Sequence, residues 1–540
     1  MSPPDLAVRL TNPRYCGFAK FNRDMSKVWI ALLLLALLAA PAQSQDSQYG
    51  EAVNLVQHGE FDRALVILRQ IVDRAPNDLK AHNLMGIALS GAGRGTEASD
   101  QFKKVLDLDP NFVPALKNLG LQELNLGRTN EAALHLGQAL KLAPSDPVPH
   151  WGLAEIAFRE RRFESAAGHY EQSGSMALKD PRVMVRFATC YIEIKQPAKA
   201  QALVDRIPWN ADPNSQFQTG LILAKLGKYD DARKRFELAE PGYPDPYDIA
   251  YNLLLLSIKQ GDFSKATQTG QAMLEKGYRK AELYNLIARA YAGSGMINEA
   301  YESLRQATVI EPLDETNYLD LIALCLEKGS YERGLSIADI GIKLIPKSGP
   351  LHVQRGAALA LKGEFDEAAN EFKTAEQLAP GGLAAAAMGL VLIQADRVPE
   401  AIAILKKRCE TGSSDPLVFW LLGEALYRSG PAPGSDSERE AIQALDKSIA
   451  IDAGLAQPRG LLGKIMLRRG ELDRAQENLE KAIQLDTDDV TTVYLLAQVY
   501  QKKGDRARAA EMFARVEKAK TSDLETTRRN LLRIIKPAAQ

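Results

Sequence analysis

Six histidines are the residues of this sequence best suited to chemistry, because an imidazole can bind a metal or transfer a proton near neutral pH. They are His58, His82, His135, His150, His169 and His352. No two of them have the spacing of a His-Glu-x-x-His zinc site, in which both rings lie on one helix face. His150 and His169 are separated by a predicted turn. The sequence therefore predicts neither a metal site nor a cofactor.

A glycine-rich run at residues 91–95 is similar to the loops that cradle phosphate groups. Such a loop follows a β-strand in nucleotide-binding proteins, and no strand pattern precedes this run. The sequence also contains no Gly-x-Ser-x-Gly elbow and no Walker motif. We therefore expect a helix–helix turn at residues 91–95, no catalytic residue, and a protein that is not an enzyme.

The composition excludes several broad classes of protein. The chain has 540 residues, of which 46% are hydrophobic and 25% are charged, as is typical of folded soluble proteins. There are 67 lysines and arginines against 68 aspartates and glutamates, so no bulk charge attracts nucleic acid. Four cysteines are too few for a disulfide scaffold.

The first 42 residues have the layout of a secretory signal peptide. Lys27 precedes an apolar run at residues 28–40, and residues 40–42 form an Ala-Pro-Ala cleavage pattern. A helix of that length spans about 20 Å, short of the hydrocarbon core of roughly 30 Å. We therefore expect cleavage after Ala42, with an uncleaved anchor as the alternative. Starting the chain at Met25 would give a compact signal, so Met25 is the expected first residue.

The expected destination follows from this signal. The sequence contains no Asn-x-Ser/Thr acceptor for glycosylation, which favours bacterial export over eukaryotic secretion. It contains no second long apolar run. We therefore expect the mature chain in the bacterial periplasm or cell envelope, with no stable membrane span after cleavage.

A repeat of about 34 residues must position all of these side chains. Its most regular feature is a small residue, here called the anchor, at Ala64, Ala98, Ala132, Ala166, Ala200, Ala232, Ala266, Ala300, Gly334, Ala368, Ala401, Ala441, Ala475 and Ala509. Ten of the thirteen intervals between successive anchors are 34 residues. A fixed period of this length is typical of solenoids built from repeated helix pairs.

Three further positions have a physical role relative to the anchor. Twelve residues earlier stands another small residue, such as Gly86, because paired helices approach closely only where side chains are small. Five residues earlier stands a turn glycine, such as Gly93, which tolerates the positive φ at a helix end. Twelve residues later a proline, such as Pro110, closes the second helix.

With these markers the sequence resembles the tetratricopeptide repeat family. The resemblance covers about fourteen units at residues 43–521, and a capping-box pattern after them predicts a C-terminal capping helix and tail at residues 522–540. It implies an all-α fold, a solenoid in which helix pairs form a right-handed superhelix and each repeat contacts chiefly its neighbours. It also implies a concave groove, lined by the first helix of each pair, that binds a partner peptide or domain.

The repeat frame places aromatic and charged residues at the groove positions, and such residues dominate many protein interfaces. The predicted groove residues are Trp151, Glu155, Phe158, Arg159, Phe217, Lys225, Tyr251, Lys259, Asn285, Arg289, Trp420, Glu424, Tyr427, Arg428 and Lys464. Ordinary packing between repeats is the alternative explanation for any one of them. The carboxylate clamp of some family members is incomplete here, because Leu121 follows Lys117 where that clamp needs asparagine.

Irregular intervals and cysteines add further expectations. The 32-residue interval contains Pro208 and Pro213, which should shorten the second helices nearby, as should the proline-rich boundary at residues 241–246. An insertion at residues 430–437 should separate the two helices of one repeat. Three cysteines in non-adjacent repeats should be unpaired and mostly buried: Cys190, Cys325 and Cys409.

These patterns favour an exported, non-enzymatic scaffold that binds protein or peptide partners along the groove. Two other classes stay open. One is a structural envelope component that self-assembles, and the other is an accessory subunit that presents a substrate to a separate envelope enzyme. Nucleic-acid binding is not expected, whereas self-association is compatible with the repeat surfaces.

Overall fold

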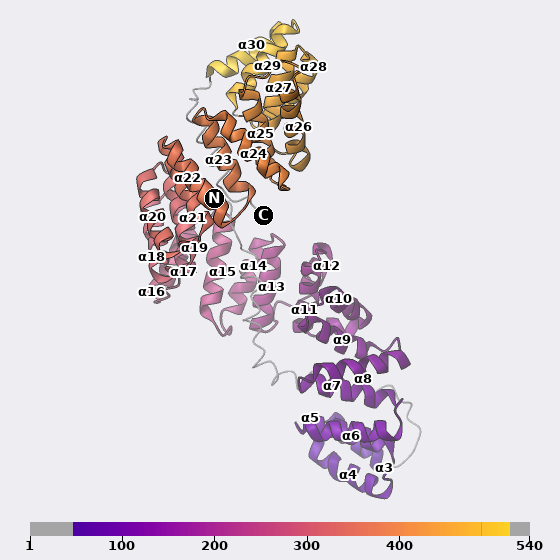
Figure 1. Cartoon of the computed structure of the whole chain (residues 1–540). Helices are drawn as coiled ribbons and strands as arrows, with labels where there is room; N and C mark the ends of the chain where they lie inside the picture. Colours follow the sequence, from indigo (N-terminus) through magenta and orange to yellow (C-terminus); the bar gives the residue numbers. More distant parts are fainter. Residues whose placement is uncertain (1–46, 488, 519–540) are drawn as a thin grey trace. The chain divides into compact units, whose positions relative to one another are not determined.

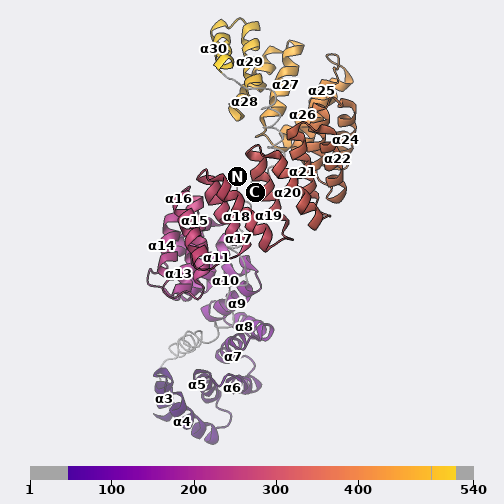
Figure 2. The same ribbon diagram turned by 90° about the vertical axis from the view of Figure 1, so that its left-hand side faces the viewer.

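A computed structural model describes residues 47–487 and 489–518, so the predicted signal peptide and the predicted capping helix lie outside the described residues. The described part contains 28 α-helices, one short 3₁₀-helix and no strand (Figures 1 and 2). In chain order the α-helices make fourteen successive pairs, and this architecture confirms the predicted α-solenoid. The chain divides into an N-terminal unit that ends at Gln260 and a C-terminal unit that begins at Gly261.

The N-terminal unit contains α3 (Ser47–Gln57), α4 (Phe61–Arg74), α5 (Leu79–Gly91), α6 (Gly95–Leu108), α7 (Val113–Asn125), α8 (Thr129–Leu142), α9 (Pro147–Arg159), α10 (Phe163–Gln172), η2 (Gly174–Leu178), α11 (Pro181–Glu193), α12 (Pro197–Val204), α13 (Pro213–Lys225), α14 (Tyr229–Ala239) and α15 (Pro246–Lys259).

The C-terminal unit contains α16 (Phe263–Glu275), α17 (Ala281–Gly293), α18 (Ile297–Ile310), α19 (Glu315–Glu327), α20 (Tyr331–Leu344), α21 (Gly349–Lys362), α22 (Phe365–Leu378), α23 (Gly382–Gln394), α24 (Val398–Glu410), α25 (Pro416–Arg428), α26 (Asp436–Ile451), α27 (Ala456–Arg469), α28 (Leu472–Leu485), α29 (Val490–Lys502) and α30 (Arg506–Lys518).

Short polar signals begin and end these helices. Aspartates cap several first helices: Asp78 accepts a hydrogen bond from the Ala81 amide at 3.0 Å, and Asp415 accepts one from the Leu417 amide at 2.9 Å. At the turn inside each pair the predicted glycines have positive φ, as in Gly93 at 79°. The glycine-rich run at residues 91–95 is therefore a helix–helix turn, as predicted.

The anchors mark the line where the helices of each pair meet. All fourteen anchors are buried. The small residue twelve positions before the anchor leaves room for a large side chain four positions after it. A Cβ on Gly86 would lie 2.4 Å from the Phe102 ring, and one on Gly220 would lie 2.7 Å from the Phe236 ring. In these two repeats the small residue of the first helix therefore lies directly against an aromatic ring of the second helix.

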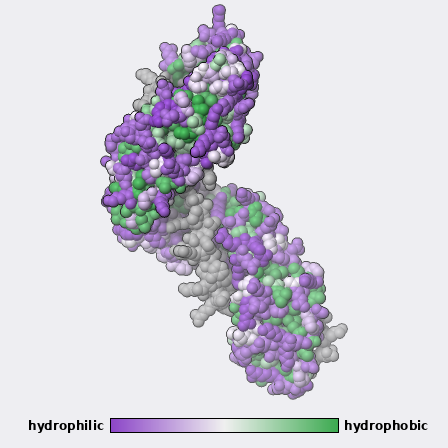
Figure 3. Space-filling model, in the orientation of Figure 1, coloured by the Kyte–Doolittle hydropathy of each residue, from purple (hydrophilic) through white to green (hydrophobic). Residues whose placement is uncertain are grey.

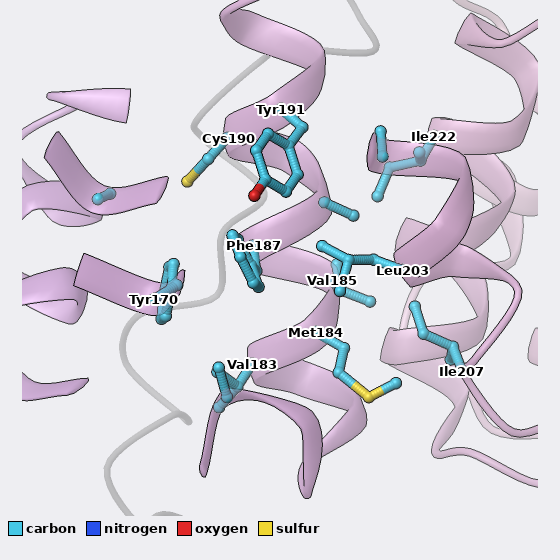
Figure 4. Packing of buried hydrophobic residues seen from close by; sticks show 14 of the residues in the cluster. Tyr170, Val183, Met184, Val185, Phe187, Cys190, Tyr191, Leu203, Ile207 and Ile222 are labelled. Atoms are coloured by element: carbon cyan, nitrogen blue, oxygen red, sulfur yellow. The ribbon is translucent and has the colours of Figure 1, made fainter. Parts of the chain in front are cut away.

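The buried hydrophobic residues follow these contacts between helices from repeat to repeat along the chain. In the N-terminal unit one cluster of buried residues extends from Leu121 to Leu256 and includes Trp151, Tyr170 and Phe236. Figure 4 shows part of this cluster around Tyr170 and Phe187. The faces seen in Figure 3 are mostly hydrophilic, with hydrophobic residues in separate small patches. No helix in the described part of the chain is both long and apolar enough to cross a membrane.

The irregular intervals alter the second helices as expected. Many second helices have 14 residues, but α12 has 8 and α14 has 11. The insertion lies between α25 and α26, as predicted. One irregularity was not predicted: α10 has only 10 residues and is followed by the 3₁₀-helix η2.

Candidate functional site

The predicted groove residues lie on the first helices of their pairs, and the surface that these helices form is here called the first-helix face. Four of the predicted residues are buried: Trp151, Glu155, Phe217 and Trp420 have 1%, 2%, 4% and 7% of their surface exposed. Trp151 and Phe217 belong to the core cluster of the N-terminal unit, and α25, which carries Trp420, packs against both α23 and α27. For these four residues the open-groove prediction is corrected to packing between repeats.

In the N-terminal unit the polar groups of this face bind one another across repeats. Glu155 of α9 accepts hydrogen bonds from Tyr170 at 2.6 Å and from Arg186 of α11 at 3.0 Å. Arg159 donates to the Leu124 carbonyl at 3.4 Å, and burial lowers its pKa. These charges stabilise the contacts between neighbouring first helices, so they are not free to bind a partner.

The other predicted residues of this unit are similarly engaged. Phe158 lies 6.0 Å from the ring of Phe163, and Lys225 pairs with Glu193 at 3.1 Å. The ring of Tyr251 lies 5.8 Å from that of Tyr247. Lys259 is exposed at the end of α15.

In the middle of the C-terminal unit the predicted residues also contact the neighbouring repeat. Asn285 donates a hydrogen bond to Asn317 at 2.8 Å. Arg289 lies near Asp320, whose pKa is raised by burial although the charge of Arg289 opposes the shift. Both contacts join α17 to α19, the first helices of adjacent repeats.

Three consecutive repeats at the end of the C-terminal unit present a different surface. Lys464 and Arg468 of α27 lie 5.1 Å and 4.8 Å from the ring centre of Tyr427 on α25. Arg428 pairs with Glu424 at 2.7 Å. Lys502 is exposed on α29. We call Tyr427, Arg428, Lys464, Arg468 and Lys502 the tyrosine–cation patch.

A buried carboxylate holds one side of this patch in place. Glu438 of α26 is fully buried and pairs with both Arg468 and Arg469. Burial alone would raise the pKa of Glu438, but hydrogen bonds from the Gly434 amide and from the two arginines lower it below its ordinary value. Glu438 therefore holds the Arg468 guanidinium itself, which lies over the ring of Tyr427.

The sequence analysis missed Arg468 and Lys502, although the repeat frame contained a signal for both. Each stands seven residues before its anchor, the position that Arg159 and Lys225 occupy in earlier repeats. The structure brings predicted Tyr427 and Lys464 together and adds Arg468, while Lys502 is exposed at the equivalent position of the next repeat. The patch therefore extends over three first helices.

The histidines form structural contacts. His150 and His169 meet with their Nδ1 atoms 3.0 Å apart, because α9 and α10 run side by side and the turn between them brings the rings together. His150 Nε2 donates to the Pro144 carbonyl, so its Nδ1 accepts a hydrogen bond from His169. His82 makes the same kind of contact to the Pro76 carbonyl at 2.9 Å.

Other residues that could do chemistry are also accounted for. Lys117 forms an ion pair with Asp146, and Leu121 is buried. Burial raises the pKa of Cys190 to about 12 and that of Cys325 to about 11, which makes both thiols poor nucleophiles. Within residues 47–487 and 489–518, no group of three or more histidine, cysteine, aspartate or glutamate side chains is placed to hold a metal ion.

Comparison with protein families gives a consistent match. Three family models described as tetratricopeptide repeat match the chain, the first at residues 55–121, 157–221 and 466–525. The second matches residues 117–173 and 217–282, and the third matches residues 281–312. Together these matches cover more than half of the 540 residues. No curated protein matches the sequence.

Solved structures of similar architecture share little sequence with this chain. The Cut9–Hcn1 hetero-tetramer of the APC/C is 16% identical with a TM-score of 0.38, over 94% of this chain and 99% of that one. Yeast Tom70 is 16% identical with a TM-score of 0.39, over 79% and 96% of the two chains. The pilF protein of Pseudomonas aeruginosa is 17% identical with a TM-score of 0.34, over 42% and 96%.

Proposed function

Because this chain belongs to the tetratricopeptide repeat family, we propose that it is an exported, non-enzymatic scaffold that binds a protein partner on its first-helix face. The observation that carries the proposal is the tyrosine–cation patch. Elsewhere on this face, polar groups such as Glu155 and Asn285 are engaged in contacts between repeats. The patch keeps cations available at the surface.

The charges of the patch favour an acidic partner segment. In the described part of the chain, Lys464 lies over the Tyr427 ring without an ion pair, and Lys502 has no acidic partner there. Arg428 is neutralised by Glu424, and Arg468 shares Glu438 with Arg469. The net charge of the patch is therefore positive. Tyrosine and arginine are frequent hot spots at interfaces, and complementary charge increases association rate and specificity.

The apolar run at residues 28–40 and the Ala-Pro-Ala pattern after it support export. On this proposal the partner is another protein of the periplasm or cell envelope. The self-assembling component and the accessory subunit gain no specific support from the described residues. They become distinguishable outcomes of the experiment below.

The test is affinity capture from the envelope fraction of the source organism, with the mature chain from Gln43 as bait. The patch variant is Tyr427→Ala/Lys464→Glu/Lys502→Glu. Its control is Lys343→Glu/Lys373→Glu, because these two lysines are exposed on the second helices α20 and α22. Circular dichroism should show that both variants are folded.

We expect the parent and the control to retain a partner that the patch variant loses. Capture of the same partner by all three baits would contradict binding at the patch. If the baits retain only copies of the chain, and light scattering shows that mass grows with concentration, self-assembly becomes the better explanation. Co-purification of an enzyme whose substrate the chain also binds would favour the accessory subunit.

A further inference from the structure

A cavity of about 330 Å³ lies in the N-terminal unit, whereas the tyrosine–cation patch belongs to the C-terminal unit. Its walls come from α10, η2, α11 and α12, and from Arg206 just after α12. Most of these walls belong to the second helices of adjacent repeats and to the connection between them. The cavity therefore lies mainly between second helices, with the first helix α11 contributing Phe187 and Tyr191.

Two shortened helices create this space. A full second helix ends ten residues after its anchor, as α6 does at Leu108, whereas α10 ends six residues after Ala166 and α12 ends four residues after Ala200. The chain leaves α10 at Gly174, which has a positive φ of 57°, and leaves α12 toward Pro208. Relative to its anchor, α10 thus ends four residues and α12 six residues earlier than α6 does.

The floor of the cavity is aromatic and already packed. The ring of Phe187 on α11 lies 5.2 Å from that of Tyr170 and 4.9 Å from that of Tyr191 (Figure 4). Leu178 of η2 and Leu203 of α12 complete the apolar lining. Because the rings are held by the core, an apolar group could enter without reordering them.

The rim of the cavity has one cation without a partner. The Glu171 carboxylate accepts hydrogen bonds from the Tyr191 hydroxyl at 2.5 Å and from Lys199 at 3.0 Å, so it is neutralised locally. The Arg206 guanidinium has no hydrogen-bond or ion-pair partner in the described residues, and the side chain is exposed. A carboxylate beside an apolar group would therefore complement this rim.

We propose that this cavity is a second interaction site, which binds an extended segment of a partner protein through one apolar side chain and an adjacent carboxylate. The apolar side chain contacts Phe187, Tyr191 and Leu203, and the carboxylate pairs with Arg206. The site does not depend on the tyrosine–cation patch, so either can fail without the other.

The loop that follows Arg206 is held by contacts with Arg235 of α14. The guanidinium of Arg235 donates to the carbonyls of Ile207 and Pro208 at 2.8 Å and 3.0 Å, and it lies 3.8 Å from the ring centre of Trp209. Trp209 is 52% exposed. The loop is thus tied to α14, and it presents a tryptophan and an arginine, both residue types that are enriched in binding hot spots.

The test uses the full mature chain and a capped six-residue peptide that contains one phenylalanine followed by one aspartate. Two control peptides replace the aspartate by asparagine or the phenylalanine by serine. Saturation-transfer NMR titrations measure binding by each peptide. Arg206→Gln removes the cation, and Ala202→Phe fills the cavity from an exposed position on α12. Arg128→Gln is the matched control, since Arg128 is also exposed and lies at the start of α8.

We expect the phenylalanine–aspartate peptide to bind the parent with a dissociation constant of about 1 mM or tighter. Arg206→Gln should weaken it about three- to fivefold, to the level of the asparagine peptide, as expected for an exposed ion pair. Ala202→Phe should abolish binding, and Arg128→Gln should change nothing.

Three results would overturn the proposal. The first is the absence of binding to the parent at about 5 mM peptide, a concentration that would detect even weak affinity. The second is binding that is unchanged in Ala202→Phe, because the peptide would then bind elsewhere. The third is equal binding of all three peptides, because the cavity would then select neither the apolar group nor the carboxylate.

Discussion

Three residues in the described part of the chain have a positive φ without being glycine: Arg161, Lys195 and Asp396, at 59°, 58° and 60°. Each stands five residues before its anchor, where most repeats have glycine. A Cβ in this region costs roughly 1–2 kcal/mol, and glycine costs about 0.5–1 kcal/mol in lost chain freedom. The difference favours glycine, and aspartate tolerates the region better than lysine or arginine does.

Lys195→Gly should therefore stabilise the chain by about 0.5–1 kcal/mol. Urea titration followed by circular dichroism measures the change. Lys228→Gly is the matched control, because Lys228 has a φ of −87° at the start of α14 and gains nothing from glycine. Equal effects of the two substitutions would show that Lys195 is not strained.

The pair of His150 and His169 makes stability depend on pH. Burial, and then the charge of His150, lower the pKa of His169 below its ordinary value of 6.5. The folded chain then binds fewer protons at this site than the unfolded chain does, so stability is highest above pH 6.5 and falls as the pH drops below it.

His169→Gln should reduce this dependence on pH. Gln101 occupies the same frame position in the second repeat and contacts His82 at 2.7 Å, so glutamine fits the contact. Melting temperatures at about pH 7.5 and about pH 5.5, on either side of the ordinary histidine pKa, are the measurement. The parent should lose more stability between these values than the variant. Parallel losses would assign the pH dependence to other groups.

The residue scale also shows where sequence reasoning about the site succeeds and fails. The repeat frame placed Lys464 and Tyr427 correctly on the first-helix face, because position on a helix follows from spacing alone. It could not tell that Trp151 and Trp420 are buried, because burial depends on how closely the neighbouring first helices approach. Replacing either tryptophan by alanine would cost about 3–5 kcal/mol and would test stability rather than binding.

The residue positions that identify the repeat are also positions at which the two helices of a pair pack together. Gly86 and Phe102 belong to the same pair, α5 and α6, and the ring occupies the place of the missing Cβ. The frame predicted a close approach of the two helices at Gly86, because a small residue recurs twelve positions before the anchor, but it did not predict the ring that fills this place. It did not predict η2, since the chain turns there at Gly174 rather than at a proline.

Gly86→Ala should accordingly destabilise the chain by about 1–3 kcal/mol, because the Phe102 ring cannot move out of a close-packed contact. Gly137→Ala should instead stabilise the chain. Gly137 lies inside α8, and no atom lies within 4 Å of the place that an alanine Cβ would take, so alanine should gain about 0.5–1 kcal/mol of helix propensity. Thermal melts compare the two. A loss at both positions would mean that the helices tolerate no added methyl group anywhere.

Across many repeats, stability in a solenoid is close to a sum of local terms, because each pair contacts mainly its neighbours. In the C-terminal unit the contacts between helices follow this rule, with α27 packed against α28, α26, α25 and α29. Glu438 tests it, because this buried carboxylate joins α26 to Arg468 and Arg469 of the next repeat. Removal of the Glu438 carboxylate should therefore destabilise the neighbouring repeats and not the whole unit.

Glu438→Gln should cost about 1.5–3 kcal/mol, because it removes the charge that Arg468 and Arg469 share, although Arg469 also pairs with Glu471. Hydrogen exchange measured by mass spectrometry should show lost protection in α25 to α28, and unchanged protection in α17 to α20. Glu477→Gln is the control, because Glu477 is exposed and its ion pair with Lys481, at 2.6 Å, lies at the surface. Since Glu438 also fixes Arg468 against Tyr427, the same variant should weaken partner binding at the tyrosine–cation patch while the α10–α12 cavity keeps its peptide. Uniform loss of protection across the unit would instead mean that these repeats unfold as one cooperative block.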